Sequence, residues 1–176
     1  MSASGPNSAD DTKAPAAPAF ERKIVAPARL AEAASALARP LVFTNGVFDI
    51  LHRGHVSYLA EARALGASLV VGLNDDESVR RLGKGEDRPV NTLADRLALV
   101  AALESVSLVS WFEDDTPLAL IVALRPDVLV KGGDWPVERI VGAAEVHGWG
   151  GSVHSIPFRF DRSTTSLLDR IRASER

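Results

Sequence analysis

Two histidines one helical turn apart, His52 and His55, flank Gly54 shortly after an apolar run at residues 41–43. The run predicts a buried strand, and the apolar spacing over residues 56–65 predicts a helix. A helix start presents unpaired backbone N–H groups and the positive end of the helix dipole, which together hold anions. Imidazoles donate hydrogen bonds to phosphate oxygens, and a glycine lets a ligand approach the backbone closely. The stretch therefore predicts a site for the phosphates of a nucleotide.

Other interpretations of the two histidines remain open. Histidines at this spacing are common as surface residues or within an ordinary helical turn, and a zinc site is a further alternative. The chain has no cysteine, and a third and fourth ligand at metal-like spacing are missing. No G-x-G-x-x-G follows a predicted strand, and there is no G-x-x-x-x-G-K-[ST], so neither a dinucleotide fingerprint nor a P-loop is present.

Three further segments carry groups that suit phosphate binding. Lys84 and Arg88 lie in a glycine-flanked loop able to close over a ligand, although such charged loops are usually only solvated. The segment 131–134, Lys-Gly-Gly-Asp, follows a predicted strand end, where a plain turn is the alternative. The hydroxyls at 163–165 open the last predicted helix, where helix capping accounts for one of them.

These motifs together resemble one enzyme family. The sequence Thr-Asn-Gly-Val-Phe-Asp at 44–49, then His-Arg-Gly-His at 52–55, Lys-Gly-Gly-Asp at 131–134 and Ser-Thr-Thr at 163–165 are similar to those of the HxGH nucleotidyltransferases, relatives of the cytidylyltransferases. Within that family the chain most resembles the adenylyltransferases that make ADP-heptose from D-glycero-β-D-manno-heptose 1-phosphate for the lipopolysaccharide core. The resemblance extends from about Leu41 to Ile171.

The resemblance implies a role for each matching residue. It implies that His52, His55 and Lys84 are catalytic. It implies a nucleotide-binding role for Thr44, Asn45, Gly46, Phe48, Gly54, Arg88, Lys131, Gly133, Asp134, Ser163, Thr164 and Thr165. Arg96 reads as a surface charge from sequence alone, whereas the resemblance places it near the active site. Two departures are Val47, where the family has cysteine, and Asp161, where it has glycine, which leaves the shape of the last phosphate loop open.

Nucleotidyl transfer requires positioning and neutralisation of charge rather than a nucleophilic side chain. A sugar phosphate oxygen attacks the α-phosphorus of ATP, and pyrophosphate leaves. We expect Mg²⁺ to accompany ATP, bound mainly by phosphate oxygens and water, with Asp49 and Asp134 as candidate ligands. Alternatives are a cytidylyltransferase acting on glycerol phosphate or a related alcohol phosphate, and a non-catalytic nucleotide-binding module. The resemblance also implies a homodimer or higher homo-oligomer.

Composition limits the class of protein. A chain of 176 residues with net charge −3 fits one domain and gives no reason to expect nucleic-acid binding. The absence of cysteine excludes disulfides and fits a reducing compartment. No apolar run approaches the length that spans a membrane, and the N-terminus lacks the apolar core of a secretory signal. We therefore expect a soluble, cytoplasmic protein with no membrane partner.

The elements that must position these residues alternate along the chain. Residues 1–19 are expected to form a disordered tail, and residues 20–176 a single nucleotidyltransferase domain that opens with a helix within 20–38. Strands are predicted from Leu41 and at 68–74, 107–112, 127–131 and 151–156; further helices are predicted at 75–82, 92–103, from 116, at 136–147 and at 163–173. This alternation predicts a doubly wound, Rossmann-like α/β fold with a five-stranded parallel sheet and helices on both faces. Ligands then bind at the carboxyl ends of the strands, beside the first strand as the switch point.

Overall fold

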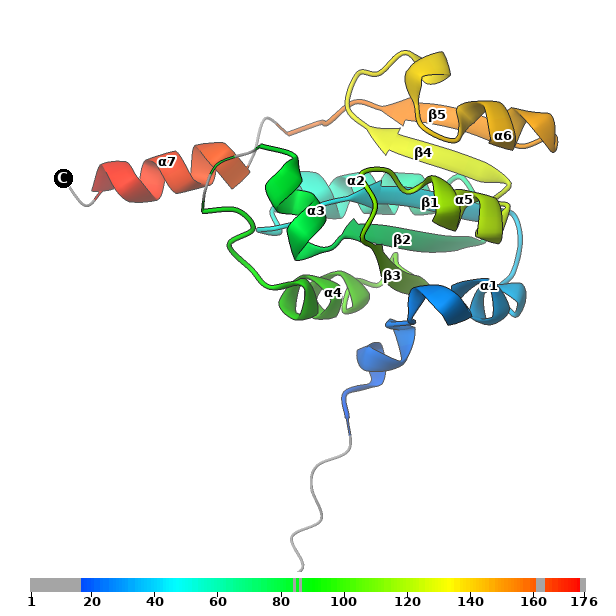
Figure 1. Ribbon diagram of the computed structural model, residues 1–176, viewed down its shortest axis with the longest axis horizontal. Helices are drawn as coiled ribbons and strands as arrows, with labels where there is room; N and C mark the ends of the chain where they lie inside the picture. Colours follow the sequence, from blue (N-terminus) through cyan, green and yellow to red (C-terminus); the bar gives the residue numbers. More distant parts are fainter. Residues whose placement is uncertain (1–16, 84, 86, 161–163, 175–176) are drawn as a thin grey trace, which may run out of the picture.

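Five parallel strands form the centre of the computed structural model, which describes residues 17–83, 85, 87–160 and 164–174 (Figure 1). The strands are β1 (Leu41–Gly46), β2 (Ser68–Asn74), β3 (Leu108–Phe112), β4 (Val128–Gly132) and β5 (Ser152–Ile156). Their order across the sheet is β3-β2-β1-β4-β5, and all four neighbouring pairs are parallel. The predicted doubly wound fold and the switch point at the first strand are confirmed.

Helices cover both faces of this sheet, as Figure 1 shows. They are α1 (Pro27–Ser35), α2 (Arg53–Arg63), α3 (Asp76–Arg81), α4 (Leu93–Ala101), α5 (Leu118–Leu124), α6 (Ala143–Gly148) and α7 (Thr164–Ser174), with 3₁₀ turns η1 (Ala19–Lys23) and η2 (Val137–Arg139). One core packs α1, α5 and α6 against Phe43 and Leu129, and the other packs α2 and α4 against Val42 and Val71. Because successive strand side chains point to opposite faces, each strand contributes to both cores. No helix in the described ranges is long and apolar enough to cross a membrane.

Of two further predicted helices, one is present in the structure and the other is broken. The short helix expected within 20–38 is present as α1, which begins at Pro27 because this proline holds the preceding Ala26 in an extended conformation with ψ 144°. The helix expected at 136–147 is wrong as a single element. Gly142 adopts a left-handed conformation with φ 88°, and it separates η2 from α6. A Cβ at Gly142 would lie 2.7 Å from Cδ1 of Ile121, so this turn is packed closely against α5.

The helix after β1 begins earlier than its apolar spacing predicts. His52 is its N-cap residue, and His55 lies in its first turn. Both histidines are therefore at the helix start, at the carboxyl edge of the central strand. The predicted tail at 1–19 lies mostly outside the described residues, and Ala19 itself begins η1.

Candidate functional site

A cavity of about 440 Å³ opens at the carboxyl edge of the sheet, between the loops that follow β1 and β4. Residues of the β1–α2 connection form one wall, and the segments after β4 and β5 form another. The start of α7 contributes Thr164, which is buried, and Thr165. The cavity therefore lies at the switch point of the strand order, where open α/β sheets bind their ligands.

The rings of His52 and His55 stack on one another at this edge. Their centroids are 3.8 Å apart, and their planes are inclined by 17°. Within the described part of the chain, the Nδ1 atom of each ring is buried and has no hydrogen-bond partner. The two rings therefore retain hydrogen-bonding capacity at the cavity wall.

The surroundings of both rings favour the neutral imidazole. Burial, followed by the proximity of His52, lowers the pKa of His55 to about 4. Burial also lowers the pKa of His52. Two stacked rings cannot both be protonated cheaply, since each cation would repel the other at short range. Near neutral pH each ring is a neutral donor and acceptor in the absence of a ligand.

Gly54 serves the histidines rather than lining the cavity. A Cβ at this position would lie 3.0 Å from both Cε1 and Nδ1 of His52. The glycine therefore gives the His52 ring its room beside the first turn of α2. The sequence suggested that Gly54 allows a ligand to approach the backbone. In the structure, the space above Gly54 is taken by the His52 ring, and Gly54 is not part of the cavity lining.

The β1–α2 connection contains a strained residue, Phe48. Its φ is 49°, which is uncommon for a residue with a side chain. Its buried ring packs edge-on to His55, with centroids 5.2 Å apart. A Cβ at Gly46 would lie 2.9 Å from the Phe48 ring, so this glycine provides the space for that ring.

Thr44 is buried below the cavity instead of facing it. Its hydroxyl lies 2.5 Å from the Tyr58 hydroxyl, and both side chains are buried. Burial, offset in part by Thr44, raises the pKa of Tyr58, so the phenol stays protonated. The Thr44 hydroxyl was predicted to contact a phosphate. In the structure it is hydrogen-bonded to the Tyr58 hydroxyl instead, and Tyr58 lines the cavity.

Arg88 reaches the cavity from the loop that follows α3, held by a buried ion pair. Its Nε donates to Oδ2 of Asp49 at 2.6 Å. The Asp49 carboxylate also accepts the backbone N–H groups of Val90 and Asn91. Asp49 is therefore a structural acceptor that joins the β1–α2 connection to the 88–91 segment, and its carboxylate is not available as the metal ligand considered from the sequence.

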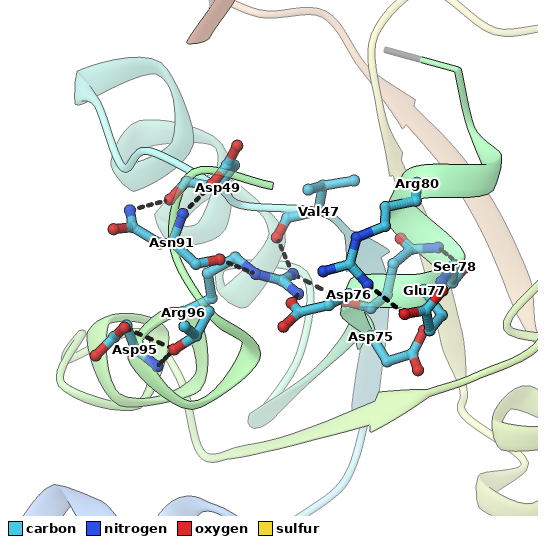
Figure 2. A network of polar contacts seen from close by, with 12 residues as sticks. Val47, Asp49, Asp75, Asp76, Glu77, Ser78, Arg80, Asn91, Asp95 and Arg96 are labelled. Atoms are coloured by element: carbon cyan, nitrogen blue, oxygen red, sulfur yellow. Dashed lines mark hydrogen bonds and ion pairs between the residues drawn. The ribbon is translucent and has the colours of Figure 1, made fainter. Parts of the chain in front are cut away.

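Arg96 is neither a surface charge nor a cavity residue. Its guanidinium is completely buried and donates to the carbonyl oxygens of Val47 and Asn74, each at 2.8 Å (Figure 2). The same group donates to Oδ1 of Asp76 at 2.7 Å and to the carbonyl oxygen of Asn91. One side chain on α4 thus ties together the loop after β1, the end of β2 and the start of α3. The expectation of a surface position was wrong.

The segment after β4 brings a lysine and two aromatic rings to the cavity. Lys131 Nζ donates to Oδ1 of Asn45 at 3.4 Å, so these two predicted residues face one another. Trp135 and Phe158 line the cavity beside Gly132. This wall is therefore largely aromatic, in contrast to the wall that carries the histidines.

Most of the residues predicted for the site lie together. Those that line the cavity are Asn45, Gly46, Phe48, His52, His55, Arg88, Lys131, Gly133, Thr164 and Thr165. Thr44 and Gly54 lie behind the wall, and Asp134 is exposed outside it. Lys84 and Ser163 lie outside the described residues, as does Asp161.

Several cavity residues were not predicted. Tyr58 lies three residues after His55 on α2, a spacing that places both on one helix face and was a usable signal. Phe158 follows the carboxyl end of β5, and the rule that ligands bind at such ends points to it. Trp135 directly follows the Lys-Gly-Gly-Asp segment, but no local pattern indicates that its ring faces the cavity.

The described residues contain no group of three or more histidine, aspartate or glutamate side chains arranged to hold a metal ion. Asp49 is already paired, and Asp134 lies apart from the cavity lining.

The sequence matches the model of the Cytidylyltransferase-like family over residues 43–172. It is 60% identical over 155 residues to the D-beta-D-heptose 1-phosphate adenylyltransferase of Bordetella bronchiseptica, a match that covers 87% of this chain and 96% of that protein. It is 51% identical to the bifunctional protein HldE of Hahella chejuensis, covering 81% of this chain but only 30% of that protein.

Solved structures share the fold. The lipopolysaccharide core biosynthesis protein of Thermoplasma volcanium superposes with a TM-score of 0.56 at 30% identity, covering 69% of this chain and 98% of that one. The pantoate-beta-alanine ligase of Francisella tularensis also gives a TM-score of 0.56, at 13% identity, covering 87% of this chain and 78% of that one. The second likeness concerns the fold alone.

Proposed function

Because the chain belongs to the cytidylyltransferase-like family, we propose that it is an adenylyltransferase that joins AMP from ATP to D-glycero-β-D-manno-heptose 1-phosphate. The products are ADP-heptose and pyrophosphate. The 60% identity to the Bordetella bronchiseptica heptose 1-phosphate adenylyltransferase, over nearly all of that protein, supports this choice of nucleotide and acceptor. We expect ADP-heptose to supply heptose to the lipopolysaccharide core, and the structural neighbour from Thermoplasma volcanium is itself a lipopolysaccharide core biosynthesis protein.

The observation that carries the proposal is the convergence of phosphate-binding groups on one cavity. Stacked imidazoles, a guanidinium, an ammonium group and two helix-start hydroxyls line it together: His52, His55, Arg88, Lys131, Thr164 and Thr165. The start of α2 lies at the same edge, where the N–H groups of Arg53 and Gly54 precede the first hydrogen bond of the helix, from the His55 N–H to the carbonyl oxygen of His52. This arrangement suits the three phosphates of a nucleoside triphosphate.

The reaction needs no nucleophile from the protein. A phosphate oxygen of the sugar 1-phosphate forms a bond to the α-phosphorus of ATP, and the bond from that phosphorus to the bridging α,β oxygen breaks. Pyrophosphate leaves with that oxygen and its electron pair, in line with the attack. The protein contributes by orienting the two anions and by neutralising the charge that moves onto the leaving group.

We assign that neutralisation chiefly to the two histidines. A neutral imidazole donates one N–H to a phosphate oxygen, and a bound polyanion raises the pKa of the ring, so the hydrogen bond strengthens as charge develops. Arg88, oriented by Asp49 through Nε, presents its Nη groups to a second phosphate. Lys84 and Ser163 are proposed to join them as the resemblance implies.

We propose that Mg²⁺ enters as part of the MgATP substrate, bound by phosphate oxygens and water. This mode requires no cluster of protein ligands, and the described residues contain none. The ion would neutralise phosphate charge, while His52, His55 and Arg88 would orient the phosphates.

We also propose that the protein acts in the cytoplasm, where ATP is available. We propose that it forms a homodimer or a higher homo-oligomer, and that residues 20–176 form a single catalytic domain. The chain spans 30% of the bifunctional HldE relative from Hahella chejuensis. To the residues of this chain we assign the nucleotidyl transfer, with the sugar 1-phosphate as a substrate.

Pyrophosphate release with ATP or CTP, each paired with heptose 1-phosphate or glycerol phosphate, tests the assignment. We expect turnover with ATP and heptose 1-phosphate; turnover with CTP and none with ATP would favour a cytidylyltransferase.

His52→Ala is expected to lower kcat by on the order of a hundredfold while ATP binding largely survives, because the lost interaction is strongest in the transition state. Unchanged turnover in that variant would contradict the role given to His52.

A further inference from the structure

Two large aromatic rings stand half-exposed at the mouth of the cavity. Trp135 is 51% exposed and Phe158 is 50% exposed, and both line the cavity. Exposing apolar rings to water has a free-energy cost, and neighbouring exposed rings usually mark a contact surface. The phosphate chemistry described above uses neither ring.

Both rings are held in place rather than left free to turn. The Trp135 indole N–H donates to the carbonyl oxygen of Gly132 at 3.2 Å, and its backbone N–H donates to the Ser155 hydroxyl at 3.0 Å. Ser155 in turn donates to the carbonyl oxygen of Gly133 at 2.5 Å. The Phe158 ring meets Tyr58 edge-on, with centroids 5.7 Å apart. The rings are thus preorganised beside the carboxyl ends of β4 and β5.

The two glycines after Lys131 provide the space for these rings. A Cβ at Gly132 would lie 2.8 Å from Cζ of Phe158, and a Cβ at Gly133 would lie 2.8 Å from Nε1 of Trp135. Gly133 also has a φ of 111°, which a residue with a side chain rarely adopts. The glycine pair therefore shapes an aromatic wall, where the sequence had suggested only close approach of the backbone to a ligand.

We propose that Trp135 and Phe158 form a stacking platform for the adenine base of ATP. This inference rests on the proposed function, since it assumes that ATP binds in this cavity. A base is flat and needs few polar partners, and bases stack on aromatic rings whatever their edge chemistry. A heptose carries many hydroxyls, whereas two of the polar groups beside the rings, the indole N–H and the Ser155 hydroxyl, already have partners.

The platform also favours a purine over a pyrimidine. A purine presents a larger face to an indole than a pyrimidine does, so more apolar surface is removed from water on stacking. Trp135 then contributes to the choice of ATP over CTP, a distinction that the phosphate-binding groups cannot make because both nucleotides carry the same triphosphate.

Steady-state kinetics of Trp135→Ala and Trp135→Phe test the platform, with Trp149→Phe as the matched control. Trp149 lies between α6 and the amino end of β5, with its indole N–H on the carbonyl oxygen of Pro126 and its ring outside the cavity lining. We expect Trp135→Ala to raise KM for ATP about tenfold, while kcat and KM for the sugar phosphate change less than about twofold. Trp135→Phe should recover most of the loss, and Trp149→Phe should behave like the unchanged protein.

Two further readouts separate stacking from a structural role. Binding of inorganic tripolyphosphate, which has no base, should be unchanged in Trp135→Ala. The ratio of kcat/KM for ATP to kcat/KM for CTP should be smaller in this variant than in the unchanged protein. Phe158→Ala should raise KM for ATP in the same direction. An active protein in which Trp135→Ala leaves KM for ATP unchanged, or raises only KM for the sugar phosphate, would overturn the platform. Absence of any ADP-heptose synthesis by the unchanged protein would instead overturn the proposed function.

Discussion

The stacked imidazoles of His52 and His55 put a pH-sensitive pair at the phosphate-binding edge. Burial keeps both rings neutral near pH 7, with the pKa of His55 lowered to about 4. A bound triphosphate reverses this balance, because negative charge close to an imidazole favours its protonated form. The histidines thus gain charge only when the phosphates are present to compensate for it.

The same burial predicts how stability depends on pH. In the unfolded chain histidine titrates near pH 6.5, whereas folded His55 titrates near pH 4. Between these values the unfolded state binds a proton that the folded state does not. The contribution of this histidine is therefore favourable above about pH 6.5 and is lost progressively as the pH falls toward 4, at most about 1.4 kcal/mol per pH unit.

Urea unfolding of the unchanged protein and of His55→Asn, measured between pH 7.5 and 4.5 without nucleotide, tests this expectation. The free energy of unfolding should fall less steeply with acidification in the variant, because asparagine does not titrate. Parallel profiles for the two proteins would contradict a lowered pKa for this ring.

At the scale of elements, Arg96 explains how loops from different strands are held in register around the cavity. Its guanidinium joins the β1–α2 connection, the end of β2 and the start of α3, while Asp49 joins the same connection to the 88–91 segment (Figure 2). These connections support Phe48 and Arg88 from behind the cavity wall. The position of the site thus depends on two ion pairs: Arg88 and Asp49 line the cavity, whereas Arg96 and Asp76 lie outside its lining.

Removing the Arg96 guanidinium is expected to be costly. Arg96→Met keeps much of the side-chain volume but leaves three carbonyl oxygens and Asp76 without their donor, so we expect a loss of about 3–5 kcal/mol in the free energy of unfolding. Arg80→Met is the matched control, since Arg80 forms an exposed pair with Glu77 on α3, and its loss should be below about 1 kcal/mol. Denaturant unfolding of both variants measures the difference, and similar small losses would contradict the structural role of Arg96.

At the scale of the whole molecule, the sheet with its two cores predicts one cooperative domain, to which η1 belongs. Ile24 bridges to Val109 on the edge strand β3, and Phe20 packs with the core that contains α2 and α4. Lys23 adds a hydrogen bond from Nζ to the carbonyl oxygen of Leu103 at 3.0 Å. The N-terminal boundary of the folded unit is therefore expected just before η1.

Two truncations test that boundary. Removing residues 1–16 should leave the unfolding midpoint and kcat unchanged, because that segment is rich in Ser, Ala, Pro and Asp and offers little apolar surface to bury. Removing residues 1–25 also removes the Phe20 and Ile24 contacts, and we expect a loss on the order of 2 kcal/mol. A large effect of the shorter truncation would place the boundary earlier in the chain.

Local pattern was sufficient for much of this protein. Apolar runs predicted every strand of the described sheet, and their alternation with helices predicted the parallel order with β1 at the centre. The spacing of His52 and His55 after β1 predicted a helix start at the phosphate site, and the structure places that start at Arg53. These features depend on residues close together in the sequence, and they can therefore be predicted from the sequence alone.

Only the tertiary structure determines which side chains face the cavity and which support the residues that line it. Thr44 contacts Tyr58, Arg88 pairs with Asp49, and Arg96 is buried rather than exposed. The aromatic wall likewise arises only when the ends of β4 and β5 lie side by side. The physical reason is that burial and hydrogen-bond partners are set by contacts between segments distant in sequence, which periodicity and local motifs do not encode.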